Sequence, residues 1–457
     1  MARLASEAIA ERPQAAQADG LARLRSLTSP YTGLVRRVHE TLRAPDDARM
    51  TLMGCQLARG EPTTGSAVDL SAAGANYEPE RALGAALGEA IERYSGTCVP
   101  RSGPVLATAS EIGPEAVDPA RFALFHEEQY ASDGFPFVPF TGDTKVRWVK
   151  GWSIPDGDPA YVPLQLAYMM RSGMCVEGEV EIAQGSSNGM SLALGVEEAT
   201  LGGLLELVER DAVMLTWANS LIHPRLDWSH DDELIEHESR HFTPAGIPYD
   251  VLDLSGFFGV PTAMALMLPR REHGNGGEPV VWGIGAASEP TMRDAWDKAI
   301  RECFQIRTAL KADLLEDPGR TSLAADEITE PLDHTYYYAD PENQARLAFL
   351  ASSERVRAPA DVPDLAGDDA ATGVEAIAER LKARGVSAYA VDITPVDVAD
   401  AGLRVVHVLS PELQPIDFPH RLRFQGGRRL YEAAFELGLR QAPLDRSDLN
   451  PEPHPFP

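Results

Sequence analysis

Acidic side chains lie beside the apolar face of a predicted helix at residues 198–215. Leucine, valine and alanine form one stripe of this helix when each residue advances by about 100°. Glu198, Glu206 and Glu209 fall together in a sector that flanks the stripe. Like charges at this spacing repel each other, and the helix contains no lysine to offset them. Either water solvates these carboxylates, or a bound divalent cation supplies the missing countercharge.

Two glycines in the same helix favour the bound cation. Gly202 and Gly203 stand in the middle of the helix, where each costs about 1 kcal/mol relative to alanine. Glycine at such a position implies that something approaches the helix backbone closely. The helix is therefore a candidate wall of a ligand site.

A second predicted helix, at residues 81–96, repeats this pattern. Glu89 and Glu92 share a face with glycine and alanine, whereas a solvated face usually carries long polar side chains. Arg93 follows Glu89 by four residues. An exposed Glu89–Arg93 pair, worth roughly a few tenths of a kcal/mol, would explain part of the pattern. The small residues beside the two acids favour the wall of a site.

A third predicted helix, at residues 291–310, places a cation beside an acid. Lys298, Glu302 and Gln305 fall within one narrow sector of its surface. Each helix alone is weak support for a site. Three helices with acids off their apolar stripes, and with cations nearby, are harder to dismiss as solvated surfaces.

A loop rich in glycine, serine and asparagine precedes the helix at 198–215. It runs from residue 184 to residue 191 with Ser187 and Asn188 at its centre. Exposed N–H and hydroxyl groups of such loops can hold polar ligand atoms. Ordinary turn chemistry explains the same composition, so the loop becomes a candidate only through its neighbours.

The composition excludes several functions. The 457 residues carry 69 acidic and 41 basic side chains, a formal charge of −28, which repels nucleic acid and anionic membranes. No apolar run approaches the ~20 residues that span a bilayer, and acids near the N-terminus are unlike a signal peptide. The four cysteines form no CxxC pair, which argues against a disulfide scaffold or a cysteine zinc site. We therefore expect a cytoplasmic protein that binds neither nucleic acid nor membrane.

Helical segments alternate with short β-like runs, which predicts an α/β protein with several strands. The predicted strands are 146–154, 161–168, 249–254, 279–284, 388–393 and 403–409. We divide the chain into a polar helical leader at 1–50, one main domain at 51–450 and a proline-rich tail at 451–457. Proline fixes φ and has no N–H, so the tail is predicted to be a polyproline II segment.

Familiar motifs are incomplete or absent. His237-Glu-Ser-Arg-His241 has the HExxH spacing, but its charged flanks are typical of an exposed amphipathic helix rather than of a buried zinc helix. Gly283 and Gly285 follow a predicted strand, yet Ser288 replaces the third glycine of a dinucleotide loop. No GxxxxGK[ST] phosphate loop occurs, so any nucleotide must be held in another way.

Five segments together resemble the signature of the YcaO family. They are Ala85-Ala-Leu-Gly-Glu-Ala-Ile-Glu-Arg-Tyr-Ser-Gly96, Ser187-Asn-Gly with Glu197-Glu-Ala, Leu205-Glu-Leu-Val-Glu-Arg-Asp-Ala212, Ala295-Trp-Asp-Lys-Ala-Ile-Arg-Glu-Cys-Phe-Gln305 and Pro331-Leu-Asp-His-Thr-Tyr-Tyr-Tyr338. The resemblance runs in order over residues 50–457. It implies a YcaO-type α/β fold with mixed sheets, in which helices line an internal cavity for ATP and Mg²⁺ without a phosphate loop.

The resemblance also implies roles for individual residues. The implied metal ligands are Glu89, Glu92, Glu206 and Glu209. The implied contacts to the nucleotide are Arg93, Ser187, Asn188, Glu198, Arg210, Lys298, Glu302 and Gln305. Two positions depart from the usual pattern: Ala85 stands where serine is common, and Lys298 stands where arginine is common. A lysine there replaces a bidentate fork with a point charge.

The proline-rich tail resembles that of family members which form azoline rings in ribosomally made peptides. In that reaction a Cys, Ser or Thr side chain of the precursor peptide attacks the preceding backbone carbonyl, and ATP phosphorylates the amide oxygen so that phosphate leaves. The resemblance implies catalytic roles for Pro455, Pro457 and Glu302, with the Pro457 carboxylate as general base. A disordered chain end is the alternative.

Other functions and partners follow from the same resemblance. An enzyme that forms a thioamide or amidine in a peptide backbone would use the same ATP site, and a non-catalytic accessory protein would keep the fold without ATP turnover. We expect that the chain lacks the E1-like or peptide-clamp domain fused in some members. The resemblance then implies a separate leader-binding partner of that kind, and a homodimer.

Overall fold

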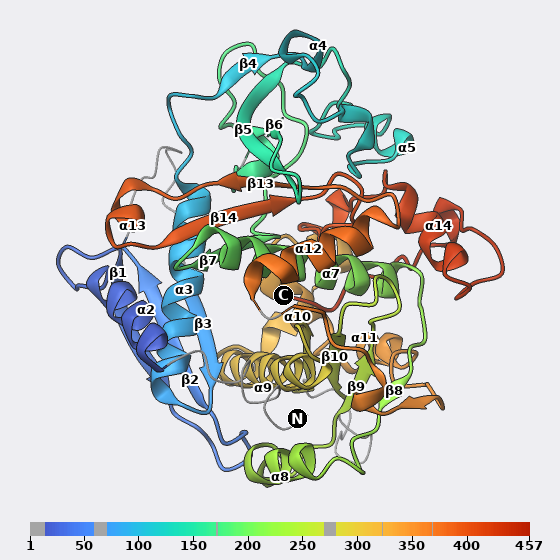
Figure 1. Ribbon diagram of the computed structural model, residues 1–457. Coiled ribbons are helices and arrows are strands. Elements are labelled where there is room, and N and C mark those ends of the chain that lie inside the picture. The colour runs from blue at the N-terminus through green and yellow to red at the C-terminus, as the bar shows by residue number, and fades with distance from the viewer. Residues whose placement is uncertain (1–13, 59–70, 171, 269–279, 322, 368) are drawn as a thin grey trace.

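Three β-sheets organise the chain in the computed structural model (Figure 1). The first contains, in order, β1 (Val35–Thr41), β2 (Thr51–Leu57) and β3 (Ser71–Asn76). The second contains β11 (Gly283–Ser288), β10 (Thr262–Met267), β9 (Asp250–Asp253), β8 (Arg225–Leu226) and β12 (Val356–Arg357). The third contains β4 (Val105–Ala107), β5 (Val146–Ile154), β13 (Ala388–Asp392), β14 (Arg404–Leu409) and β7 (Met190–Ala193), with β6 (Pro159–Pro163) paired to β5.

The structure describes residues 14–58, 71–170, 172–268, 280–321, 323–367 and 369–457. Its three long helices are α3 (Pro79–Thr97), α7 (Val196–Ala218) and α9 (Met292–Glu316). The shorter ones are α2 (Gln14–Ser26), α4 (Ala109–Ile112), α5 (Glu127–Tyr130), α6 (Leu164–Ala167), α8 (Asp232–His241), α10 (Pro331–Tyr337), α11 (Pro341–Gln344), α12 (Ala370–Lys382), α13 (Val396–Asp400) and α14 (Arg428–Glu436). Within the described ranges, no helix has both the length and the apolar character needed to cross a membrane.

The three long helices pack between the sheets. α3 covers β2 and β3 and also contacts β7, whereas α9 covers β10 and β11 and also contacts β3. α7 lies between β7 and β14 of the third sheet and β11 of the second. Each of the three long helices therefore contacts strands of two different sheets (Figure 1).

Local sequence explains where the long helices begin. α3 begins with Pro79, whose fixed φ and missing N–H suit a first turn. α7 follows Gly195 and has acidic side chains in its first turn, where negative charge is favoured by the helix dipole. At the start of α9 the Thr291 side chain accepts a hydrogen bond from Asp294 N.

The mid-helix glycines of α7 have an explanation within the chain. A Cβ atom on Gly202 would lie 2.2 Å from Ser191 Oγ, and one on Gly203 would lie 2.5 Å from Gly189 O. The close approach to the helix backbone is therefore made by residues 189–191 as α7 packs on the third sheet. The inference that these two glycines favour a bound cation is wrong for that reason.

Most of the predicted elements are confirmed. The helices predicted at 81–96, 198–215 and 291–310 are α3, α7 and α9. The strands predicted at 146–154, 249–254, 388–393 and 403–409 are β5, β9, β13 and β14.

Three predicted elements need correction. The leader at 1–50 is helical only in α2, because β1 forms an antiparallel ladder with β2 that satisfies its backbone; residues 1–13 lie outside the described residues. The strand at 161–168 ends at Pro163, where α6 begins. The strand at 279–284 is shifted to β11 at Gly283–Ser288, and residue 279 is outside the described residues.

A buried ion pair joins α7 to the C-terminal part of the chain. Arg429 of α14 donates to both carboxylate oxygens of Asp211, with Nη2–Oδ2 at 2.6 Å and Nε–Oδ1 at 3.1 Å. Gln414 N donates to Asp211 Oδ1 at 2.9 Å. The Asp211 side chain is 0% exposed and that of Arg429 is 10% exposed.

We expect Asp211→Ala to lower the free energy of unfolding by about 3–5 kcal/mol, because it leaves a buried guanidinium without its partner. Urea unfolding followed by fluorescence measures this loss. Arg428→Ala is the matched control, since Arg428 is 66% exposed and pairs with Glu436 at the surface; its expected loss is about 1 kcal/mol or less. Equal losses for the two variants would contradict the prediction.

Candidate functional site

The carboxylates of α3 and α7 approach each other beside β7. Glu92 of α3 accepts a hydrogen bond from Leu192 N at 2.7 Å through Oε1. Burial raises the pKa of Glu92 to about 8, and repulsion by Glu206 of α7 adds to the shift. Acids from two distant parts of the chain therefore share one poorly solvated region.

Two acids of α7 point into the same region. The Glu209 side chain is 6% exposed, and its Oε2 accepts a hydrogen bond from Ser288 N at 3.2 Å, at the end of β11. The Glu206 side chain is 25% exposed, and burial raises its pKa to about 7. Burial also raises the pKa of Glu209. The positive charge around these carboxylates does not compensate their loss of water.

Arg210 faces both α7 acids without a close contact to either. Its Nε lies 3.8 Å from Glu206 Oε1 and 3.6 Å from Glu209 Oε1, which is longer than a hydrogen bond. Within the described residues this buried Nε has no hydrogen-bond partner. The buried Nδ2 of Asn188 also has no partner there. Two unpartnered buried donors fit a ligand that carries oxygen atoms.

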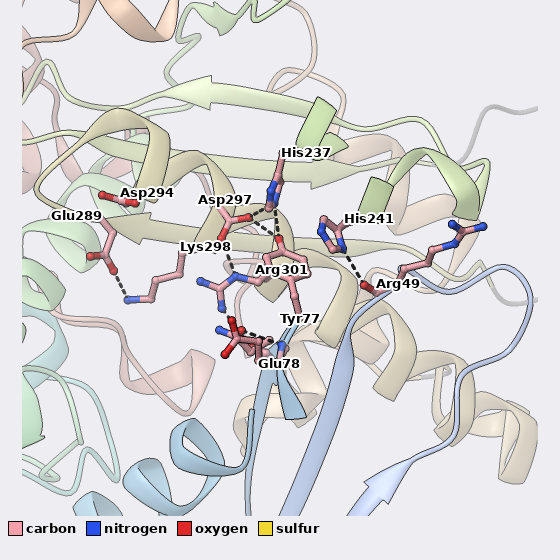
Figure 2. Close-up of polar contacts among 12 residues, drawn as sticks. Arg49, Tyr77, Glu78, His237, His241, Glu289, Asp294, Asp297, Lys298 and Arg301 are labelled. Carbon is pink, nitrogen blue, oxygen red and sulfur yellow. Dashed lines mark hydrogen bonds and ion pairs between the residues drawn. The ribbon is translucent and has the colours of Figure 1, made fainter. Parts of the chain in front are cut away.

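α9 contributes a cation and another acid. Lys298 Nζ forms an ion pair with Glu289 Oε1 at 2.9 Å (Figure 2). The pKa of Glu302 is raised to about 7 by burial and then by repulsion from Glu209. Gln305 follows Glu302 on the same helix and is half-buried. The carboxyl groups of α7 and α9 are thus electrostatically coupled.

The face of α3 that carries Glu89 is open. A Cβ atom on Gly88 would meet no atom within 4 Å. Glu89 Oε1 pairs with Arg93 Nη2 at 2.5 Å, and Arg93 also donates to Ser71 O. Although burial opposes the shift, several glutamates including Glu89 raise the pKa of Arg210. Glu89 therefore belongs to the acidic cluster, whereas Arg93 also bonds to the first sheet.

Among the described residues, no hydrogen bond or ion pair joins the other predicted site residues to these carboxylates. Glu198 is exposed at the start of α7, with its Oε2 turned toward Gly195. Ser187 is half-buried in the loop before β7. Pro455 is buried and Pro457 is half-buried. The hydrogen bonds described for the tail join it to the last turn of α7 and to α10, rather than to the acids.

A small cavity of about 70 Å³ lies beside the cluster. Its wall includes Ser186 and Asn188 from the loop before β7 and Arg210 from α7, together with apolar side chains such as Leu166. The two unpartnered donors described above therefore belong to residues that line one cavity. A ligand with an apolar part and an anionic part would suit this wall.

His407 is a residue of this cavity that sequence reasoning missed. Its Nδ1 lies 2.8 Å from Ala167 O, and its Nε2 lies 2.7 Å from Asn188 O. The ring is fully buried and ties β14 to the loop that carries Asn188. A single histidine within the apolar run 403–409 belongs to no recognisable motif. The sequence therefore could not predict its contacts with Ala167 and Asn188.

The HExxH-like segment has partners of another kind. His237 Nε2 lies 2.8 Å from Asp297 Oδ1 and 2.9 Å from Tyr77 OH (Figure 2). Arg301 Nε binds the other oxygen of Asp297 at 2.9 Å. These contacts tie α8 to α9 beside Lys298. The prediction of an exposed amphipathic helix is confirmed, since Leu234 is the one buried residue of α8, and His237 with its side chain 30% exposed lies on the face toward α9.

The carboxylates fit Mg²⁺ only together with a nucleotide. Among the described residues, no three histidine, cysteine or acidic side chains are arranged to hold a metal ion by themselves. Mg²⁺ usually binds through one or two carboxylates, waters and the phosphate oxygens of its substrate rather than through a protein cage. The raised pKa values mark carboxylates that lack countercharge, and Arg210 offers a free donor beside them. This donor set suits a magnesium–phosphate group.

A family model described as YcaO cyclodehydratase, ATP- and Mg²⁺-binding, matches residues 23–414. The chain belongs to the YcaO family. A heterocyclase solved in complex with substrate and cofactor is similar with a TM-score of 0.76 at 24% identity, over 96% of this chain and 57% of that chain. YcaO from Methanopyrus kandleri, bound with AMPPCP and Mg²⁺, is similar with a TM-score of 0.61 at 19% identity, over 87% of this chain and 91% of that chain.

A curated relative of this YcaO chain is an uncharacterized protein in the tfuA 3′ region of Rhizobium leguminosarum bv. trifolii. It is 33% identical over 132 residues, which are 28% of this chain and 30% of the relative. The chain thus spans only part of this relative and about half (57%) of the heterocyclase. The similar structures confirm the predicted YcaO-type α/β fold with mixed sheets.

The raised pKa values of the YcaO acids predict how stability depends on pH. Glu92, Glu206 and Glu302 keep protons in the folded state up to about pH 7–8, whereas the ordinary pKa of a glutamate is 4.5. Without nucleotide and Mg²⁺, the contribution of these three carboxyl groups to the free energy of unfolding should therefore fall as pH rises from about 5 to 8, because the unfolded chain releases their protons first. Urea unfolding at several pH values measures the slope.

Glu206→Gln should reduce this slope, and the exposed control Glu127→Gln should leave it unchanged. Slopes between about pH 5 and 8 that are equal in the wild type and in Glu206→Gln would contradict the assignment.

Proposed function

We propose that the chain is an ATP-dependent peptide cyclodehydratase, which converts Cys, Ser or Thr residues of a ribosomally made precursor peptide to thiazoline or oxazoline rings. The observation that carries this proposal is the cluster of poorly compensated carboxylates from α3, α7 and α9 around the unpartnered Nε of Arg210. It supports a magnesium–triphosphate site, in agreement with the ATP- and Mg²⁺-binding description of the family model.

Each part of the cluster has a proposed task. The metal contacts are assigned to Glu89, Glu92, Glu206 and Glu209. Arg210 and Lys298 hold phosphate oxygens and offset the charge that develops on them. Asn188, fixed by His407, binds the nucleotide through its free Nδ2. When bound, ATP supplies the phosphoryl group that makes the amide oxygen able to leave.

Proton transfer is assigned to Glu302 and to the tail. The pKa of Glu302, raised to about 7, allows this carboxyl to hold or release a proton at neutral pH. The Pro457 carboxylate acts as general base on the attacking side chain, and Pro455 stiffens the segment that carries it. Burial of residues 453–456 supports a fixed tail rather than a disordered one.

Partners are proposed on the same basis. The precursor peptide is the substrate, and a separate E1-like or peptide-clamp protein binds its leader. We also propose that the enzyme is a cytoplasmic homodimer.

Glu206→Gln should lower peptide-dependent ATP hydrolysis by about 100-fold, because it removes a metal contact made during phosphoryl transfer. Coupled release of phosphate and the mass of the peptide product measure the effect. The exposed control Glu127→Gln should keep wild-type activity.

The product decides between the classes of reaction. Loss of one water per modified residue supports ring formation, whereas exchange of oxygen for sulfur in the wild-type product would overturn it. Absence of ATP turnover with every precursor offered would also refute the proposal.

Deletion of Phe456 and Pro457 should abolish ring formation while nucleotide binding stays within about 3-fold, because the tail serves the peptide rather than ATP. Isothermal titration with a non-hydrolysable ATP analogue measures binding, and mass spectrometry measures rings. Pro457→Ala, which keeps a carboxylate at the same place, is the control and should retain activity. Unchanged ring formation in the deletion variant would refute the role of the tail.

A further inference from the structure

One face of α10 forms a row of hydrogen bonds with the proline-rich tail. His334 and Tyr337 lie in α10 and Tyr338 follows directly, so the three side chains share one side of this turn. Tyr337 OH donates to Glu452 Oε2 at 2.9 Å, Tyr338 OH donates to Pro453 O, and His334 Nδ1 lies 2.6 Å from His454 O. Three consecutive tail residues thus contact donors on one side of α10 and of the cap that ends it.

The two histidines of this contact have defined protonation. His334 Nδ1 must carry a hydrogen because it faces the carbonyl oxygen of His454, and His454 Nε2 must carry one because it lies 2.8 Å from Asp417 O. Burial lowers the pKa of His334 to about 3 and lowers that of His454 well below its usual value. The two neutral rings stack with centroids 3.9 Å apart and planes inclined by 15°.

This pairing leaves buried acceptors without donors. His334 Nε2, His454 Nδ1 and Asp417 Oδ1 have no hydrogen-bond partner among the described residues. Their side chains are 0%, 2% and 2% exposed. Unpartnered polar groups at such burial lower stability, so an apolar contact would anchor the tail better. The polar pair therefore suits a role in fixing one position of the tail rather than in adding stability.

We infer that α10 is the docking element of the tail and that His334 is a positioning residue, which sets the register of the tail and thereby the place of Pro457. The inference deepens the proposed function, because it matters for ring formation only if the Pro457 carboxylate is the base. Proline fixes φ at positions 453, 455 and 457. A register fixed at His454 O is therefore transmitted along a stiff segment to the chain end.

Two substitutions at one position separate the hydrogen bond from ring stacking. His334→Phe keeps a stacking ring but removes the Nδ1–H donor, whereas His334→Asn places an amide N–H near the same point and removes the ring. Full-length proteins are compared by hydrogen exchange of the tail amides at residues 452, 454 and 456, and by kcat for ring formation and KM for ATP. His230→Phe at an exposed site is the matched control.

We expect His334→Phe to speed exchange of the tail amides about 10-fold and to lower kcat by about 10- to 100-fold at unchanged KM for ATP, because a small misplacement of a catalytic group is costly. His334→Asn should restore both values toward those of the wild type. If His334→Phe fails to fold, Tyr338→Phe serves instead, since it removes one donor to the tail and keeps the ring.

Two results would overturn the inference. Unchanged tail exchange in both His334→Phe and Tyr338→Phe would refute docking through α10. Faster exchange with unchanged kcat would refute positioning. If the wild type forms no ring on any precursor, the proposed function fails, while the exchange measurement still decides whether α10 docks the tail.

Discussion

Repulsion among buried carboxylates is the interaction on which the candidate site depends. Three helices bring Glu92, Glu206, Glu209 and Glu302 together, and burial together with mutual repulsion raises the pKa of each. A fold selected only for stability would replace such a cluster by apolar residues. Its presence is explained when a cation and a polyanion complete the charge balance in the working state of this YcaO protein.

α7 connects the parts of the molecule that such chemistry needs. Its middle turns carry Glu206, Glu209 and Arg210, while the next residue, Asp211, is turned to Arg429 of α14. Its last turn reaches the tail, because the Trp217 indole donates to Glu452 O at 3.0 Å. One rigid helix thus fixes both the acidic cluster and the anchorage of the proline-rich segment.

The helices of the site could be predicted from sequence because each has a clear apolar stripe. The 3.6-residue period shows that Glu206 and Glu209 leave that stripe, but it does not show which other helix they face. Their approach to Glu92 and Glu302 became an expectation only through the resemblance to a family. Periodicity also could not explain Gly202, because its close neighbour Ser191 belongs to another element.

Long-range contacts without a local pattern were beyond sequence reasoning. The strand β1 has a mostly polar sequence without a regular apolar alternation, and its hydrogen-bond ladder with β2 is what identifies it as a strand. His407 and His334 act through backbone carbonyls that lie far away in the sequence. Backbone acceptors are the same at every residue, so no side-chain spacing signals them.

The protonated carboxyl groups have a practical consequence for kinetics. At neutral pH the net charge is less negative than the formal −28, because Glu92, Glu206 and Glu302 are partly protonated. Loading with magnesium–nucleotide would expel those protons into the medium. A pH-indicator assay in weak buffer would therefore record an initial acid pulse that comes from the enzyme itself, before any phosphate is released.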